Sequence, residues 1–312
     1  MKLLLPKRAY SALVDLAKTI LYRPTPTQAS PLTCISVHSN GRRVACGTQD
    51  GRILLITTST GKLQLMAKGH EALVSSVRFV GEGSKLVSCS WDGTTRLWAL
   101  GRTVTETAIM KHDAQTKVLA VTSSSVKGAV GARDGIIKIF SKQNLKCLRN
   151  IDAHKTDISG LAFTSDASLL ISTSWDGESK LWNTSTNELV RTIEKQKERI
   201  RSVAVSPDDS RVFLGLHSGS IVSASLEGNS KPVTLKGHTD MVSSLSVDPS
   251  GRYLVSGSWD RSIRVWSLET MSLLCREKLW TALTAHEWGP RGERIYSTHA
   301  SGALATWDLK WY

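Results

Sequence analysis

The chain has 312 residues, with 40 lysines and arginines against 27 aspartates and glutamates, so its formal net charge is +13. No stretch reaches the roughly 18 consecutive apolar residues of a membrane-spanning helix, so we expect no membrane insertion. The leucines at positions 3–5 are followed at once by Pro6, which leaves too short an apolar run for a signal peptide. Five cysteines without a Cys-x-x-Cys pair argue against a disulfide framework and a zinc site, and they indicate a reducing compartment.

The N-terminal segment has the pattern of a short amphipathic helix. Residues 7–20 place four apolar side chains on one helical face: Ala9, Leu13, Leu16 and Ile20. The segment is basic, as mitochondrial targeting segments are, but it contains Asp15, and such segments avoid acids. We therefore treat residues 1–19 as an N-terminal extension and leave its role open between a helix, an arm and a targeting segment.

From about residue 20 onward the chain repeats one unit, which residues 69–110 illustrate. Alternating apolar and polar residues predict strands at 73–79 and 85–90, with shorter strands near 95–98 and 103–109. A glycine-rich turn separates the first two strands, and Asp92-Gly93 forms the tight turn between the second and the third. Each unit is therefore predicted to be a four-stranded antiparallel sheet.

The units follow one another at a fixed period. The tight turns lie at positions 50, 92, 134, 176, 218, 260 and 301, so that successive turns are 42 residues apart five times and then 41. A period near 40 residues indicates repeated units that bury a core only by stacking on their neighbours.

The best-preserved copies resemble the WD-repeat family. They read Ser-Trp-Asp-Gly at 90–93 and 174–177 and Ser-Trp-Asp-Arg at 258–261, and Gly-His dipeptides occur at 69–70 and 237–238. The resemblance runs from about residue 20 to the end. It implies an all-β fold, a seven-bladed WD-repeat β-propeller in one domain over residues 1–312, with the blades in 20–312.

The N-terminus is expected to close the ring. Residues 20–25 lie 42 positions before 62–67, the last strand of the first unit, and only residues 308–312 follow Trp307. The seventh blade would therefore lack its fourth strand unless the N-terminal strand supplied it, which would also remove an open sheet edge. The C-terminal Lys310-Trp311-Tyr312 would either cover this seam or act as a peptide that a partner reads.

Three units contain a His, a Ser, an Asp and a Trp at identical spacing. A Ser-His-Asp set can form a hydrolase triad, but an active site needs one copy, and no Gly-x-Ser-x-Gly elbow occurs. A buried Trp N–H, a Ser hydroxyl, a His ring and an Asp carboxylate can instead satisfy one another, and WD-repeat proteins have a tetrad of this kind. We expect structural tetrads, no catalytic residues, and no tetrad in the units at 218 and 301, which lack the Asp. The expected members are His70, Ser88, Asp92 and Trp98; His154, Ser172, Asp176 and Trp182; and His238, Ser256, Asp260 and Trp266.

The family resemblance also implies that three positions per blade line one face around the central channel. In this chain they form a predicted partner-binding face: Trp91, Lys117, Arg133, Trp175, Arg199, Arg201, His217 and Trp259. In the last unit they read Leu283, Ala285 and Ala300, and Asp157 is an acid among the cations. Trp and Arg are frequent interface hot spots and suit stacking and phosphate contact. The alternative is that the Trp before each Asp packs on the neighbouring blade.

The basic charge favours an acidic partner. We expect a non-enzymatic scaffold with no cofactor and no metal, docking other proteins within a ribonucleoprotein or other acidic multi-subunit assembly, with RNA or an acidic protein in contact. The alternative is a signalling adaptor like the G protein beta subunits that reads acidic or phosphorylated peptides, although their long N-terminal coiled-coil helix has no counterpart in this sequence. Such a protein is expected in the cytoplasm or nucleus, with a mitochondrial location as the alternative.

Overall fold

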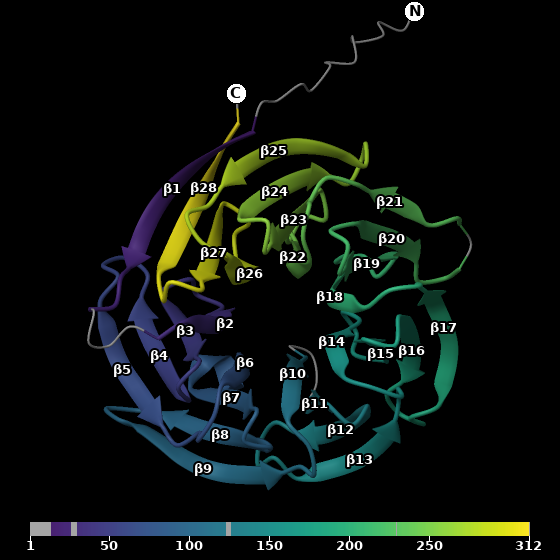
Figure 1. Cartoon of the computed structure of the whole chain (residues 1–312). Coiled ribbons are helices and arrows are strands. Elements are labelled where there is room, and N and C mark those ends of the chain that lie inside the picture. Colours follow the sequence, from purple (N-terminus) through teal and green to yellow (C-terminus); the bar gives the residue numbers. More distant parts are fainter. Residues whose placement is uncertain (1–13, 26–29, 123–125, 229, 312) are drawn as a thin grey trace, which may run out of the picture.

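The seven sequence repeats fold into seven antiparallel four-stranded sheets, which stand as blades around one axis in a β-propeller (Figure 1). This computed structural model describes residues 14–25, 30–122, 126–228 and 230–311. Within these residues the one helical element is the short 3-10 turn η1 (Gly81–Gly83), and no helix is long and apolar enough to span a bilayer. The predicted fold class, an all-β propeller of seven blades, is confirmed.

The blades follow one another in chain order around the ring. The first two comprise β2 (Leu32–Val37), β3 (Arg43–Thr48), β4 (Arg52–Thr57) and β5 (Leu63–Lys68), then β6 (Val74–Val80), β7 (Lys85–Ser90), β8 (Thr94–Leu100) and β9 (Val104–Lys111). The third and fourth comprise β10 (Thr116–Val121), β11 (Lys127–Ala132), β12 (Ile136–Ser141) and β13 (Cys147–Asp152), then β14 (Ile158–Phe163), β15 (Leu169–Ser174), β16 (Glu178–Asn183) and β17 (Leu189–Lys195). The fifth and sixth comprise β18 (Ile200–Val205), β19 (Arg211–Leu216), β20 (Ile221–Ser225) and β21 (Val233–Leu235), then β22 (Val242–Val247), β23 (Tyr253–Ser258), β24 (Ser262–Ser267) and β25 (Ser272–Lys278). The seventh comprises β26 (Leu283–Trp288), β27 (Arg294–His299), β28 (Leu304–Trp311) and β1 (Val14–Tyr22).

Glycine sets the tight turn between the second and third strands of most blades. Gly135 has φ +82°, and a Cβ on it would lie 2.0 Å from the carbonyl oxygen of His154. This oxygen belongs to the loop that leads into the next blade, so only a residue without a side chain lets the turn approach it. The glycine thereby joins neighbouring blades as well as reversing the chain.

The hydrophobic core lies between the blades. One cluster, for example, joins Ile53 and Leu55 of β4 to Val74 and Val77 of β6 and to Trp98 of β8. Each blade thus completes the core of its neighbour, as the period of the sequence predicts for stacked units.

The ring closes where the two ends of the chain meet, with β1 antiparallel to β28 (Figure 1). The pairing runs from Val14 opposite Trp311 to Tyr22 opposite Leu304. The predicted N-terminal closure is confirmed, but the strand begins at residue 14 rather than 20. The amphipathic helix expected over residues 7–20 is therefore wrong for 14–20, while residues 7–13 lie outside the described residues.

Tertiary pairing explains this difference. The β28 edge offers a row of unpaired N–H and C=O groups, and pairing with it outweighs the helical pattern of a short segment. Leu16 is buried in the core of the last blade. The Lys18 ammonium lies 3.0 Å from the centroid of the Trp280 ring, which adds a cation–π contact to the seam.

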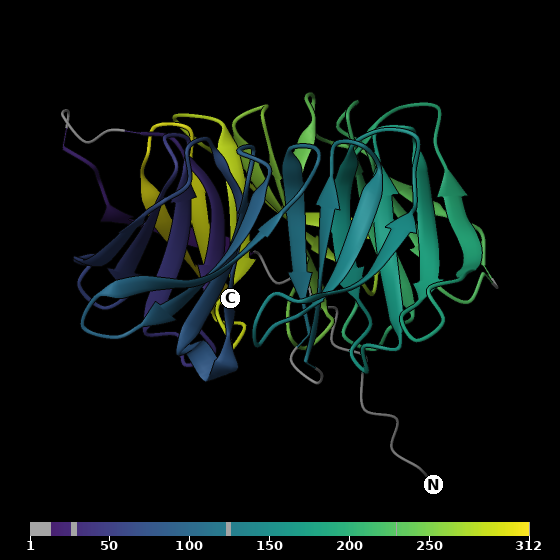
Figure 2. The same ribbon diagram turned by 90° about the horizontal axis from the view of Figure 1, so that it is seen from below.

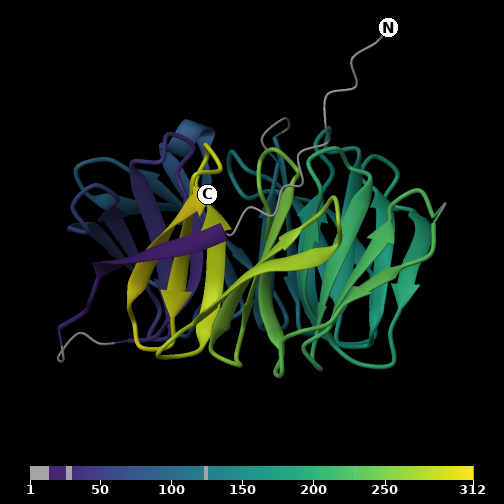
Figure 3. The same cartoon turned by 90° about the horizontal axis from the view of Figure 1, so that it is seen from above.

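The disc has two faces with different connections, seen edge-on in Figures 2 and 3. One face, here called the rim face, carries the turns between second and third strands and the loops that join successive blades. The opposite face carries the turns between first and second strands and between third and fourth strands, η1 among them. η1 lies at the lower edge of Figure 2 and at the upper edge of Figure 3.

Truncation tests the closure. Deleting residues 1–13 leaves β1 whole, so a soluble monomer with an unchanged Tm is expected. Deleting residues 1–22 removes β1, exposes the β28 edge and uncovers Trp307, so aggregation and a lower Tm are expected. Size-exclusion chromatography and thermal unfolding measure both. A monomeric 1–22 deletion with the Tm of the full chain would show that β1 does not stabilise the ring.

Candidate partner-binding face

Hydrogen bonds connect the four residues predicted as a tetrad in the second blade. The Trp98 indole N–H donates to Ser88 Oγ at 2.8 Å, Ser88 Oγ lies 2.7 Å from His70 Nε2, and His70 Nδ1 lies 2.7 Å from Asp92 Oδ2. The other two sets have the same order of bonds, with distances of 2.8, 2.7 and 3.1 Å through Trp182, Ser172, His154 and Asp176, and 2.8, 2.7 and 2.9 Å through Trp266, Ser256, His238 and Asp260.

A neutral histidine fits this chain of donors. Trp donates to Ser, Ser donates to His Nε2, and His Nδ1–H donates to Asp, so that every donor has one acceptor. Burial lowers the pKa of His70, His154 and His238, which favours the neutral ring. The serine hydroxyls are fully buried and already engaged at both ends, so they are not presented to a substrate.

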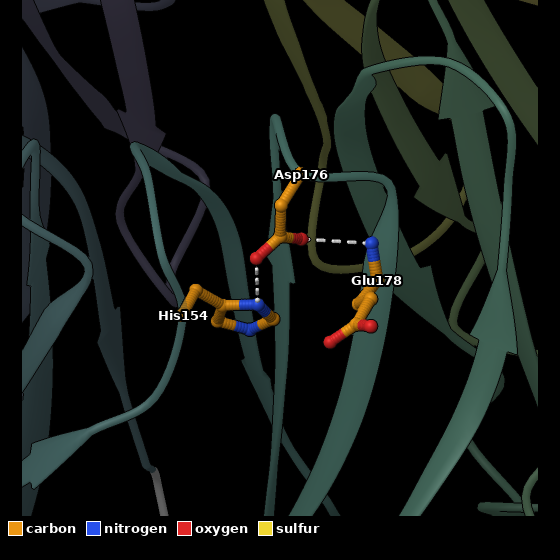
Figure 4. A group of neighbouring side chains, drawn as sticks. All are labelled: His154, Asp176 and Glu178. Carbon is orange, nitrogen blue, oxygen red and sulfur yellow. Dashed lines mark hydrogen bonds and ion pairs between the residues drawn. The ribbon is translucent and has the colours of Figure 1, made fainter.

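A cluster of His154, Asp176 and Glu178 also brings three groups of metal-ligating type within 4.8 Å of one another (Figure 4). Asp176 accepts from His154 Nδ1 and, at 2.8 Å, from the backbone N–H of Glu178. Lys180 and Lys195 lie 3.2 and 2.9 Å from the Glu178 carboxylate. Two ammonium groups therefore already neutralise the acid that a metal ion would need, and the cluster is better described as an ion-paired network.

The last blade has a partial network that the sequence pattern missed. Trp307 Nε1 donates to Ser297 Oγ at 2.8 Å, and Ser297 Oγ lies 3.0 Å from Nε2 of His299. This histidine comes from β27 rather than from the loop that leads into the blade, and the Trp280 ring stacks on it at 4.7 Å. The sequence does contain a signal for this network. His299 stands at the end of the second strand, where the second blade has Ser90.

A backbone hydrogen bond in each blade fixes the residue that precedes the turn on the rim face. The N–H of Trp91 donates to Leu73, that of Trp175 to Asp157, and that of Trp259 to Met241, at 3.0 to 3.2 Å. The four remaining bonds are Gln49 to Pro31, Arg133 to Gln115, His217 to Arg199, and Ala300 to Ala282.

This last bond corrects the expectation for the seventh blade, where Leu283 and Ala285 were placed on the rim. The register pairs Leu283 with His299, as Val242 pairs with Ser258, so the rim positions are Ala282 and Thr284. The sixth repeat is one residue shorter than the others. The rim position that corresponds to Met241 therefore lies 41 residues later, at Ala282, rather than 42 residues later, at Leu283.

Lys117 lies between two of the predicted aromatic residues. Its Nζ is 4.5 Å from the centroid of the Trp91 ring, 4.9 Å from that of Trp175 and 3.3 Å from Oδ1 of Asp157. The side chain is only 16% exposed, and burial lowers its pKa while the Asp157 carboxylate opposes this change. Lys117 thus supports the two rings and presents little charge to solvent.

Two arginines of the fifth blade lie against the ring of Trp175. The guanidinium carbons of Arg199 and Arg201 lie 5.0 and 4.8 Å from the centroid of the Trp175 ring. Arg199 is exposed, and so is Arg133 in the third blade, whose side chain is 60% exposed. The structure therefore places Lys117, Arg199 and Arg201 around Trp175. Arg133 lies beside them, with its Nε 3.9 Å from Oδ1 of Asp157.

The remaining predicted residues lie farther along the ring, in the fifth and sixth blades. His217 is exposed, and Trp259 is 51% exposed. The rim face thus continues past the cations with an accessible indole, which is the kind of side chain on which a partner can stack.

Comparison with known proteins agrees with the repeat pattern. Four segments, residues 22–56, 61–99, 145–183 and 229–267, match the family model described as WD domain, G-beta repeat. With seven in-phase units and seven blades, the chain belongs to the WD-repeat family.

Similar proteins carry related names. Periodic tryptophan protein 2 of Saccharomyces cerevisiae is 31% identical over 137 residues, 44% of this chain and 15% of that protein. Its homolog in Mus musculus is 43% identical over 76 residues, 24% and 8% of the two chains. WD repeat-containing protein 55 of Arabidopsis thaliana is 28% identical over 145 residues, 45% and 40% of the two chains. The matched part thus spans less than half of each relative.

The tetrad role can be tested with two aspartates at equivalent turns. Asp176→Ala removes the acceptor of buried His154, so the free energy of unfolding should fall by about 1–3 kcal/mol. Asp134→Ala is the matched control, because His112 of that blade bonds Thr95 at 2.9 Å instead. Equal losses in the two variants, measured by urea unfolding, would contradict the role.

Buried histidines should make the fold sensitive to acid. Burial, aided by the nearby Lys138 ammonium, lowers the pKa of His112 from 6.5 to about 4. Between these pH values His112 is protonated in the unfolded chain and neutral in the folded chain. The free energy of unfolding is therefore highest above pH 6.5 and falls as the pH drops toward 4. The expected loss is about 1.4 kcal/mol per pH unit for this group. His112→Asn should reduce that slope in unfolding measurements between pH 7 and 5, and an unchanged slope would refute the assignment. His217→Asn, at an exposed position, is the control.

Proposed function

We propose that this chain is a non-enzymatic docking platform within a multi-subunit assembly, and that the rim face binds a phosphate-bearing or acidic chain of a partner. The proposal rests on the fold and on the rim residues rather than on the relatives, whose printed names state repeated Trp or WD repeats and no partner.

The arrangement around Trp175 is the observation that carries the proposal. Cations from the third and fifth blades lie on both sides of one indole in the fourth blade, held in place by ring contacts about 5 Å long. Because the contacts fix the side chains before a partner arrives, little conformational entropy is lost on binding. An anionic chain crossing from Arg133 to Arg199 meets charge, an aromatic surface and charge again.

A ribonucleoprotein is the assembly that this face suits best. The net charge of +13 favours a polyanion, and exposed Trp91 and Trp259 offer surfaces on which unpaired bases can stack. Such an assembly places the chain in the nucleus or cytoplasm. The second candidate is a signalling adaptor, because the same exposed arginines can pair with the phosphate of a phosphorylated peptide.

A charge reversal tests the rim face directly. Arg133→Glu with Arg199→Glu changes two exposed cations and should leave the Tm unchanged. Binding of a labelled single-stranded RNA, measured by fluorescence anisotropy over a salt series, should weaken, and the slope of log K against log salt should fall by about 1.4 for two lost phosphate contacts.

The matched control is Lys231→Glu with Lys236→Glu, two exposed lysines beside β21 at the outer edge of the fifth blade. If the control weakens RNA binding as much as the rim variant does, binding reflects net charge and the rim proposal fails. If the chain binds a phosphoserine peptide but no RNA, and the rim variant abolishes that binding, the adaptor is the correct function.

A further inference from the structure

Charge is divided between two halves of the face opposite the rim. The turns and adjoining strand ends of the first three blades carry cations and one acid, Glu82; these cations are Arg42, Arg43, Lys62, Lys85, Arg102, Lys127, Lys142 and Lys146. The corresponding turns of the next three blades carry mostly acids, namely Asp166, Glu188, Asp208, Asp209, Glu227, Asp248 and Glu269 against Arg211, Lys231 and Arg252. We call the first group the basic arc.

Five cations of this arc have no acidic partner among the described residues. Within the described part of the chain, no carboxylate lies within the 4 Å of an ion pair from Arg42, Lys62, Lys85, Arg102 or Lys142. Lys142 Nζ donates to the backbone carbonyl of Thr122 in the same blade. The positive potential of the arc is therefore available to a partner.

A hollow with apolar walls lies inside the basic arc, at the junction of the second and third blades. Val80 and Val126 line it together with two cations, Lys85 and Lys142, and with Gly81, Glu82 and Gln143. Val126 is 55% exposed, a larger exposed fraction than that of any other large hydrophobic residue among the described ones. An exposed apolar side chain between two lysines, within an arc whose one acid is Glu82, is suited to a partner that offers both an apolar group and negative charge.

The composition of the arc decides between two classes of polyanion. Single-stranded nucleic acid binds through aromatic side chains on which bases stack, as well as through cations. The turns that form the basic arc contain no Phe, Tyr or Trp, whereas the rim face has its tryptophans. An acidic peptide with one apolar side chain matches both the charge and the hollow.

We infer that the basic arc is a second docking surface, which binds an acidic protein segment and takes one of its apolar side chains beside Val126. This surface lies on the face opposite the proposed rim site and does not depend on it. A chain with two such faces can hold two partners at once, one on each side of the disc.

The inference can be tested with a short labelled acidic peptide that has one central leucine and with the same peptide carrying serine instead. Anisotropy at low salt is measured in the Arg133→Glu, Arg199→Glu background, so that the rim site does not contribute. The leucine peptide should bind about tenfold more tightly, which is the gain expected for burying one such side chain. Val126→Ser should remove this preference, and Lys85→Glu with Lys142→Glu should weaken both peptides while the Tm shows an intact fold.

Three results would overturn the inference. The two peptides would bind with equal affinity if the hollow received no side chain. The Lys85→Glu, Lys142→Glu variant would keep its peptide affinity, while Lys231→Glu with Lys236→Glu lost it, if the arc were not the site. A single-stranded RNA that competed better than the leucine peptide would make the arc a nucleic-acid surface. None of these results depends on whether the rim face binds its own partner.

Discussion

Every blade of this structure shares its core with its neighbours, and the rest of the molecule depends on that sharing. A four-stranded sheet with two apolar faces cannot bury both alone, so each cluster draws side chains from adjacent blades. An open row of blades would leave two uncovered faces, and the ring removes both. The pairing of β1 with β28 is therefore a condition for the whole fold rather than a local detail of one blade.

Burial between blades also explains where polar networks are tolerated. A Trp at the end of the third strand brings an indole N–H into the core, which must find an acceptor. In the second, fourth and sixth blades the acceptor is a serine that a histidine and an aspartate complete in turn. In the third blade Phe140 stands at the Trp position and needs no acceptor, and His112 bonds Thr95 instead. The polar set is thus complete in three blades, partial in the last blade, where Trp307, Ser297 and His299 are connected without an aspartate, and without its Trp in the third.

The sequence alone predicted the fold well because the period is a global property that single substitutions do not erase. The spacing also grouped the tetrad residues, but Ser88 and Ser90 recur at the same period, and the choice of Ser88 came from the family resemblance. In the structure Ser88 bonds His70, and Ser90 bonds the carbonyl of Ala72. Their effect on stability stays a prediction. The predictions that were wrong have local causes. Residues 14–20 form a strand because they pair with the edge of β28, although their sequence has a helical pattern.

The rim face was predictable only as a set of positions. The family resemblance placed the tryptophans and cations on one face. It could not show that Lys117 lies against two indoles beside Asp157, while Arg133 contacts the same carboxylate and stays 60% exposed. These differences arise from side-chain contacts between blades that are far apart in the sequence. The last blade adds a deletion of one residue, which shifted its rim positions from Leu283 to Ala282.

The seam between β1 and β28 also has a consequence for synthesis of the chain on the ribosome. Tyr22 pairs with Leu304, so β1 leaves the ribosome about 280 residues before the strand with which it pairs. At the usual translation rate of about 5–20 residues per second, this delay is roughly 15–60 seconds. Throughout that time β1 has no strand to pair with, and the face of the first blade that packs on the seventh blade is uncovered. The nascent chain thus exposes an apolar surface and an unpaired strand, the features that favour aggregation. A propeller closed by its N-terminus is thus vulnerable during translation for longer than one closed by adjacent strands.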